Sequence, residues 1–210
     1  MARRSSSYED SVFINCPFDT NYWPLFEALV FTVLACGFNP RCALEELDSG
    51  TVRLDRIQRV IRSCRYAVHD LSRVELSGRR SLPRFNMPFE LGLDIGRRRF
   101  GVGQLRRKRV LILDSTRYRY QAFISDISGQ DIHTHGNSPR NLIRRVRDWL
   151  RTSSHRSSIP GPLDIARSFR GFTRSLPENC RANGLDRRNL LFVDYVRLAR
   201  IWIDAERIGN

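Results

Sequence analysis

The chain alternates short apolar segments with helical patterns, and this alternation restricts its fold more than any other feature. Residues 12–18, 66–71 and 109–114 are rich in the aliphatic and aromatic residues typical of buried strands. Residues 24–35 form a largely apolar helical pattern, and residues 53–64 carry apolar residues at spacings of three and four. Strands that alternate with helices imply a parallel sheet covered by helices on both faces, an α/β fold.

Weaker patterns complete the expected order of elements. Residues 39–45 and 130–133 predict two further strands, and residues 139–150 predict a closing helix. We expect residues 74–83 to form a polar, basic loop. Five parallel strands favour a flavodoxin-like order, in which a ligand binds at the carboxyl ends of the strands that flank the switch point. The first and third strands would flank that point.

A break in composition divides the chain. Residues 1–151 predict the α/β domain, residues 152–162 predict a linker rich in serine and proline, and residues 163–210 predict a small helical C-terminal extension. The extension has two apolar stripes at helical spacing: Ile165, Phe169, Phe172 and Leu176, then Leu191, Tyr195, Leu198 and Trp202. Because roughly 45 residues seldom hold a separate core, we expect the extension to pack on the first domain. A second copy or another protein is the alternative partner.

Composition narrows the class of protein. A hydrophobic content of 41% is enough for a packed core. The longest apolar stretch, residues 28–36, is too short to span a membrane, and residues 1–7 lack the apolar segment of a secretory signal. The five cysteines show no C-x-x-C spacing, which favours reduced thiols in a cytoplasmic protein.

The charge is strongly positive, with a net value of +14. Nearly all of the basic residues are arginines, and Lys108 is the single lysine. Such a balance favours anionic partners such as nucleotides or nucleic acid. We expect Arg106, Arg107 and Arg109 to contact phosphates. The alternative is that this segment is a solvated helix end, where cations complement the helix dipole.

Two motifs place carboxylates near the expected switch point. The third strand runs into Asp70-Leu71-Ser72, and a second motif reads Asn86-Met87-Pro88-Phe89-Glu90-Leu91-Gly92. Pro88 predicts a helix that begins near Asn86, with Glu90 in or near its first turn. The helix dipole there favours an ionised carboxylate, which is well placed to stabilise a sugar cation. The alternative is that Glu90 only complements the dipole.

These motifs resemble those of nucleoside 2-deoxyribosyltransferases and the related TIR-like domains. The shared pattern is a strand, Asp-Leu-Ser, a gap and Asn-x-x-x-Glu-Leu-Gly, and the resemblance covers residues 11–150. It implies that Glu90 is a catalytic nucleophile and, by analogy with enzymatic TIR domains, that NAD is cleaved at the nicotinamide ribose. A further aspartate of the transferases falls where this chain has Arg84. That departure argues against ordinary nucleoside transfer more than against N-glycosidic chemistry in general.

The resemblance also implies further site residues. Asp70 would bind a ribose hydroxyl or orient Glu90. The substrate-binding candidates are Cys16, Phe18, Asp19, Ser72 and Asn86. Alternatives remain for each type: Asp19 as a helix cap, Asp70 and Ser72 as turn residues, and Cys16 as a buried structural thiol.

The sequence thus predicts cleavage of the N-glycosidic bond of a nucleotide, and the resemblance implies a role in bacterial antiphage defence. The alternative is a non-catalytic module that binds a nucleotide or nucleic acid and passes a signal to a partner. No cofactor is expected, with NAD or another nucleotide as the substrate. A weak metal pattern exists in Asp131, His133 and His135, which alternate and would share one face of a strand.

Overall fold

The computed structural model describes residues 7–74 and 84–208. Its centre is a five-stranded parallel sheet with the order β2-β1-β3-β4-β5, which confirms the flavodoxin-like α/β fold. The strands are β1 (Ser11–Asn15), β2 (Asn39–Arg41), β3 (Tyr66–Asp70), β4 (Arg109–Asp114) and β5 (His133–Thr134). The expected polar loop at 74–83 lies, beyond Val74, outside the described residues.

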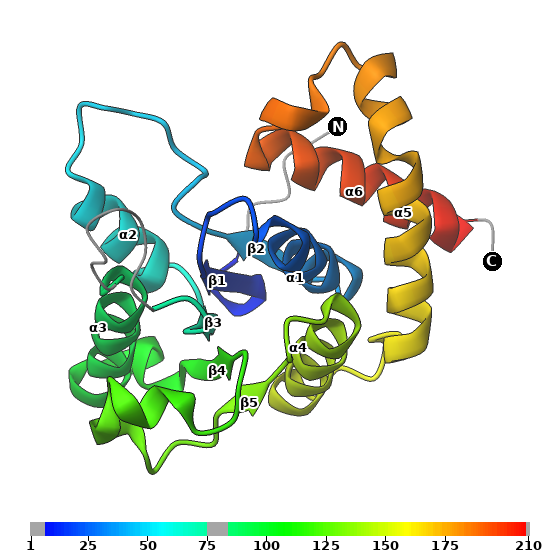
Figure 1. Ribbon diagram of the computed structural model, residues 1–210. Coiled ribbons are helices and arrows are strands. Elements are labelled where there is room, and N and C mark those ends of the chain that lie inside the picture. The colour runs from blue at the N-terminus through cyan, green and yellow to red at the C-terminus, as the bar shows by residue number, and fades with distance from the viewer. Residues whose placement is uncertain (1–6, 75–83, 209–210) are drawn as a thin grey trace.

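Helices cover both faces of the sheet (Figure 1). One face carries α1 (Trp23–Ala35) and α4 (Pro139–Ser154), and the other carries α2 (Arg53–Arg62) and α3 (Asn86–Phe100). Alternate residues of β1 serve the two faces: Val12 and Ile14 belong to the α1 side, whereas Phe13 packs with α2. This double burial explains why the strands are almost continuously apolar in sequence.

The C-terminal extension forms α5 (Pro162–Ala182) and α6 (Phe192–Ile208), which pack on α1 (Figure 1). The ring of Phe172 stacks on Phe31 with 5.3 Å between centroids, and the Tyr195 hydroxyl donates to the Glu27 carbonyl at 2.9 Å. The extension therefore shares one continuous core with the sheet domain, as we expected. The connection is shorter than the predicted linker, because α4 continues through Ser154.

Short 3-10 helices complete the chain. They are η1 (Tyr8–Asp10), η2 (Gly103–Arg107), η3 (Arg119–Ala122), η4 (Ser125–Ile127) and η5 (Arg187–Asn189). Only η3 and η4 occupy the connection from β4 to β5, so no α-helix covers the sheet in that described stretch. Gln130 belongs to the turn that follows η4, because its backbone amide donates to the Ile127 carbonyl. The strand β5 therefore begins later than predicted.

The cysteines and the helices bear on two further predictions. All five cysteines are buried and none forms a disulfide. Among the described residues, no helix combines the length and the apolar character that crossing a bilayer requires.

Candidate active site

A cavity of about 560 Å³ lies at the carboxyl end of β1, between the starts of α2 and α3. Its volume is in the range of small-molecule sites. The lining residues are Asn15, Cys16, Pro17, Phe18, Asp19, Arg53, Arg84, Phe85, Asn86, Met87 and Glu90. The structure therefore brings together Glu90 and four of the five predicted substrate-binding residues. Ser72 and the second catalytic candidate, Asp70, do not line this cavity.

The end of β1 holds the first turn of α3 in place. The Asn15 side-chain amide donates to the Met87 carbonyl at 2.9 Å. Asn15 is the last residue of β1 and is buried, so this bond joins the sheet directly to the start of the helix. Glu90 follows Met87 by less than one helical turn and is thereby positioned on the cavity wall.

Glu90 is nearly buried, with 8% of its surface exposed. Burial raises the pKa of its carboxyl from 4.5 to about 7, although the charge of Arg53 opposes that rise. Among the described residues, none donates a hydrogen bond to this carboxylate. The expected effect of the helix dipole, which favours the ionised form, does not prevent this rise, because desolvation dominates. At neutral pH the carboxyl therefore exists in both protonation states.

Asp19 makes a capping contact and also lines the cavity. Its Oδ1 accepts from the Tyr22 amide at 3.1 Å just before α1, which is a capping contact. Its Oδ2 lies 2.7 Å from the Arg84 guanidinium and 3.2 Å from that of Arg73. Arg84 thus brings a cation to the cavity.

Three other predicted residues form the wall of the cavity. Burial raises the pKa of the Cys16 thiol well above its usual value, so Cys16 is a neutral structural thiol and not a nucleophile. Phe18 packs edge-on against Phe26 and supplies an apolar surface. Asn86 is exposed at the first position of α3.

Asp70, the second predicted catalytic residue, lies in a buried polar network and not on the cavity wall. The residue is fully buried, and its Oδ2 accepts from the Tyr22 hydroxyl at 2.6 Å and lies 3.0 Å from Nε2 of His135. Its Oδ1 accepts from the Ser72 amide at 2.8 Å. Burial alone would raise the pKa of Asp70, but these contacts, His135 foremost, outweigh it and lower the pKa. Ser72 is likewise buried, so it shares this structural role.

A buried polar network beneath α3 was not predicted from the sequence. Lys108 Nζ lies 3.0 Å from the Asp94 carboxylate, whose other oxygen lies 3.1 Å from His69 Nε2. The Asn15 amide nitrogen lies 2.9 Å from Nδ1 of the same histidine. The network links Lys108 to the Asn15–Met87 bond and so to the position of Glu90. Its one sequence signal was a single lysine among 36 basic residues. His69 is fully buried in the core.

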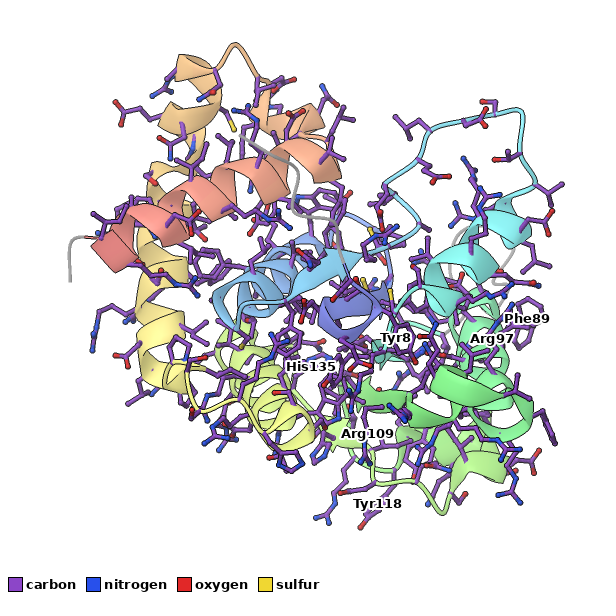
Figure 2. All side chains as sticks on the ribbon, turned by 180° about the vertical axis from the view of Figure 1, so that it is seen from behind. Tyr8, Phe89, Arg97, Arg109, Tyr118 and His135 are labelled. Carbon is purple, nitrogen blue, oxygen red and sulfur yellow. The ribbon has the colours of Figure 1, made fainter. Side chains whose placement is uncertain are left out.

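The alternative metal site is not formed. His135 is buried against Asp70, near the centre of the molecule (Figure 2), whereas the Asp131 side chain is 93% exposed. His133 lies 3.8 Å from Asp131. Among the described residues, no group of three or more histidine, cysteine or carboxylate side chains could hold a metal ion.

The predicted phosphate-binding arginines separate in the structure. Arg106 lines a second cavity, together with Arg98 and Arg99. Arg107 and Arg109 are exposed outside it. The basic segment is therefore not one uniform surface.

Comparison with known proteins returned no match, whether to a family model, a curated protein or a solved structure. The resemblance to deoxyribosyltransferases and TIR-like domains thus rests on the motifs that carry Asp70 and Glu90.

Proposed function

We propose that the protein cleaves the N-glycosidic bond of a nucleotide, with Glu90 as the carboxylate that meets the sugar. The observation that carries this proposal is a nearly buried carboxyl on the wall of a 560 Å³ cavity, with its pKa raised to about 7. Perturbed carboxyl groups in cavities are typical of catalytic acids, bases and nucleophiles. A role in bacterial antiphage defence belongs to the same proposal and rests on the resemblance alone.

The ionised form of Glu90 performs the reaction in two steps. The bond from the anomeric carbon of the sugar to the base nitrogen breaks, and its electron pair leaves with the base. A Glu90 oxygen stabilises the resulting sugar cation or bonds to the anomeric carbon. Water then adds its oxygen to that carbon and loses a proton, which frees Glu90 for the next cycle.

The cavity favours a base that departs without being protonated. Glu90 acts here as the ionised carboxylate. Among the other described lining residues, only Asp19 and Cys16 have side chains of the type that could donate a proton to a leaving base. Asp19 is held by two arginines and Cys16 is a buried thiol. Nicotinamide leaves NAD as a neutral molecule with no added proton, so NAD fits this site better than an ordinary nucleoside. Arg53 and Arg84 would hold its phosphates.

Incubation of the purified protein with NAD and with a panel of nucleosides, followed by chromatography for free base, tests the proposal. We expect nicotinamide release from NAD, and we expect Glu90→Gln to reduce its rate at least about 10³-fold, as for loss of a nucleophile. Glu178→Gln is the matched control, because it makes the same chemical change on the exposed surface of α5. Full turnover by Glu90→Gln would refute the assignment.

The pH dependence of base release gives a second test. Because the ionised carboxylate reacts and its pKa is raised to about 7, kcat/KM should rise with pH through about 7 and then level off. A profile that is flat between about pH 5 and pH 9 would contradict the role of Glu90.

A second candidate function is nucleotide binding without cleavage. It is favoured by Arg84, which ion-pairs with Asp19 at the position of the transferase aspartate. The same incubation separates the two functions. A binding module retains NAD in equilibrium dialysis and releases no base, so the wild type and Glu90→Gln should then leave the NAD equally intact.

A further inference from the structure

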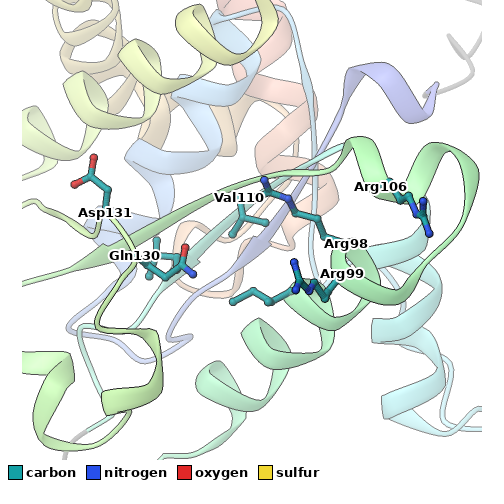
Figure 3. Close-up of a pocket in the computed structure, with 8 residues that line it drawn as sticks. Arg98, Arg99, Arg106, Val110, Gln130 and Asp131 are labelled. Carbon is teal, nitrogen blue, oxygen red and sulfur yellow. The ribbon is translucent and has the colours of Figure 1, made fainter.

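A second cavity lies at the opposite end of α3, near the amino end of β4. Its volume is about 630 Å³, and it is shown in Figure 3. The residues that line it are Ile95, Arg98, Arg99, Arg106, Val110, Ile112, Gln130 and Asp131. It shares no lining residue with the Glu90 cavity. Glu90 and Arg98 are eight positions apart on α3, which separates the two sites by roughly 12 Å along the helix.

The topology explains why this part of the sheet is open. A connection from β4 to β5 in a doubly wound fold usually contains a helix that covers the sheet. Here the connection holds only η3 and η4. Val110 and Ile112, two residues apart on β4, face the same side of the sheet, and with Ile95 of α3 they supply apolar surface to the cavity.

Arginines from two separate elements border this apolar surface. Arg98 and Arg99 come from the last turn of α3, and Arg106 comes from η2 (Figure 3). Within the described part of the chain, none of the three forms an ion pair with a carboxylate. Arg106 donates to the Gly101 carbonyl at 2.9 Å, which fixes its side chain without neutralising its charge.

The helix dipole does not account for this arrangement by itself. Cations at the end of α3 complement the dipole, which explains Arg98 and Arg99. It does not explain why Arg106, from the following element, lines the same cavity, or why three apolar side chains lie beside the arginines. The one acidic lining residue, Asp131, is 93% exposed and lies 3.8 Å from His133, so solvent screens its charge.

We propose that this cavity binds a small amphiphilic anion, with a flat apolar group against Val110, Ile112 and Ile95 and a phosphate or diphosphate against the arginines. Guanidinium groups bind phosphate oxygens through paired, charge-assisted hydrogen bonds. Three of the eight lining residues are apolar and five are polar or charged, so the cavity offers surface to both parts of such a ligand. A nucleoside diphosphate has both parts and a suitable size.

Titration calorimetry with ADP, adenosine and pyrophosphate tests both parts of the proposal. Adenosine lacks the anion and pyrophosphate lacks the flat group, so ADP should bind at least about tenfold more tightly than either. The double variant Arg98→Ala/Arg106→Ala should weaken ADP binding by about 10- to 100-fold, because it removes charged hydrogen-bond donors. Arg107→Ala/Arg109→Ala removes the same charge from the same segment outside the cavity, and should change the affinity less than about twofold.

Gln130→Trp provides a variant that keeps every arginine. Gln130 is exposed at the cavity, so the indole should occupy part of the space without disturbing the core, and ADP binding should again weaken. Glu90→Gln should leave ADP binding at this site unchanged, which makes the result independent of the proposed cleavage reaction.

Three results would overturn the proposal. One is equal weakening by the two arginine double variants, which would indicate only a general positive field. Another is ADP binding that survives both Arg98→Ala/Arg106→Ala and Gln130→Trp, which would locate the ligand elsewhere. The third is an absence of ADP binding to the wild type, whether or not a DNA or RNA oligonucleotide binds there and is weakened by Arg98→Ala/Arg106→Ala.

Discussion

Asp70 and Glu90 are two carboxyl groups at the same end of the sheet, yet their surroundings are opposite. Asp70 is fully buried and has three polar hydrogen-bonding neighbours, and its pKa is lowered. Glu90 is nearly as buried, has no hydrogen-bond donor among the described residues, and has a pKa raised to about 7. Burial alone therefore does not determine the state of a carboxyl group. The hydrogen-bond donors around it set its protonation state, and the carboxyl without such donors is the one that is available to a ligand.

The difference follows from which segments surround each group. Tyr22 precedes α1, Ser72 follows β3 and His135 follows β5, so Asp70 joins three parts of the fold. Glu90 instead faces a cavity, and the one charge that affects its pKa is that of Arg53, an exposed residue at the start of α2. Asp70 thus holds parts of the fold together, whereas Glu90 faces the cavity.

The largest expected effect comes from removing the assembled carboxylate. Asp70→Ala leaves Tyr22, Ser72 and His135 without their buried acceptor, which should destabilise the protein by about 3–5 kcal/mol at neutral pH. Because the folded pKa of Asp70 lies below its usual 3.8, its contribution is present above that pH and is lost as pH falls below it. Urea unfolding followed by tryptophan fluorescence measures the loss.

A double variant shows whether the unsatisfied donors are the cause. Tyr22→Phe removes the hydroxyl that Asp70→Ala leaves unpaired, so the two changes together should cost less than their sum. If Asp70→Ala is within about 1 kcal/mol of the wild type, the contrast with Glu90 fails.

Glu90→Gln should act in the opposite direction on stability. The folded pKa of about 7 exceeds the usual 4.5, so the folded state prefers the protonated carboxyl. The stability from this preference is full below about pH 4.5 and is lost as the pH rises through about 7. Glutamine stays neutral, so the variant should gain stability relative to the wild type at pH 8, by at most about 3 kcal/mol, and little at pH 4.

Urea unfolding at both pH values measures that gain, with Glu178→Gln as the exposed control that should change neither. A variant that is less stable than the wild type at pH 8 would show that an ionised Glu90 is favourably solvated in the cavity. That result would remove the basis for its raised pKa.

Much of the fold could be predicted because its signals are local. The apolar run of β4 was predicted with its bounds as observed. The unbroken burial of α1 from Leu25 to Ala35 also accounts for the docked extension, since a helix that is apolar all round needs cover on all sides. The beginning of β5 was missed, because the turn around η4 depends on backbone hydrogen bonds that leave no pattern in composition.

The site was predictable only where its residues follow strand ends or begin a helix. Glu90 and Asp19 belong to such segments, and both line the cavity. Asp70 follows a strand in the same way, but its role is set by Tyr22 and His135, which are distant in sequence. Arg53 was missed because nothing local separates it from the other exposed arginines of α2. The position of a residue in a motif therefore predicts its place in the fold, whereas its role depends on the residues that contact its side chain.

The smallest expected effect tests whether Glu90 senses the one charge near it. Arg53 lowers the pKa of Glu90, so Arg53→Gln should raise that pKa further, by about half a unit for a solvent-exposed charge. The rising limb of the base-release profile should move to higher pH by the same amount, while the plateau at high pH stays unchanged. Arg62→Gln is the control, because it removes an equal charge from the far end of α2. In the Glu90→Gln background, Arg53→Gln should no longer alter the pH dependence of urea unfolding. A shift to lower pH, or the same shift in Arg62→Gln, would show that Glu90 responds to the overall charge of the protein and not to Arg53.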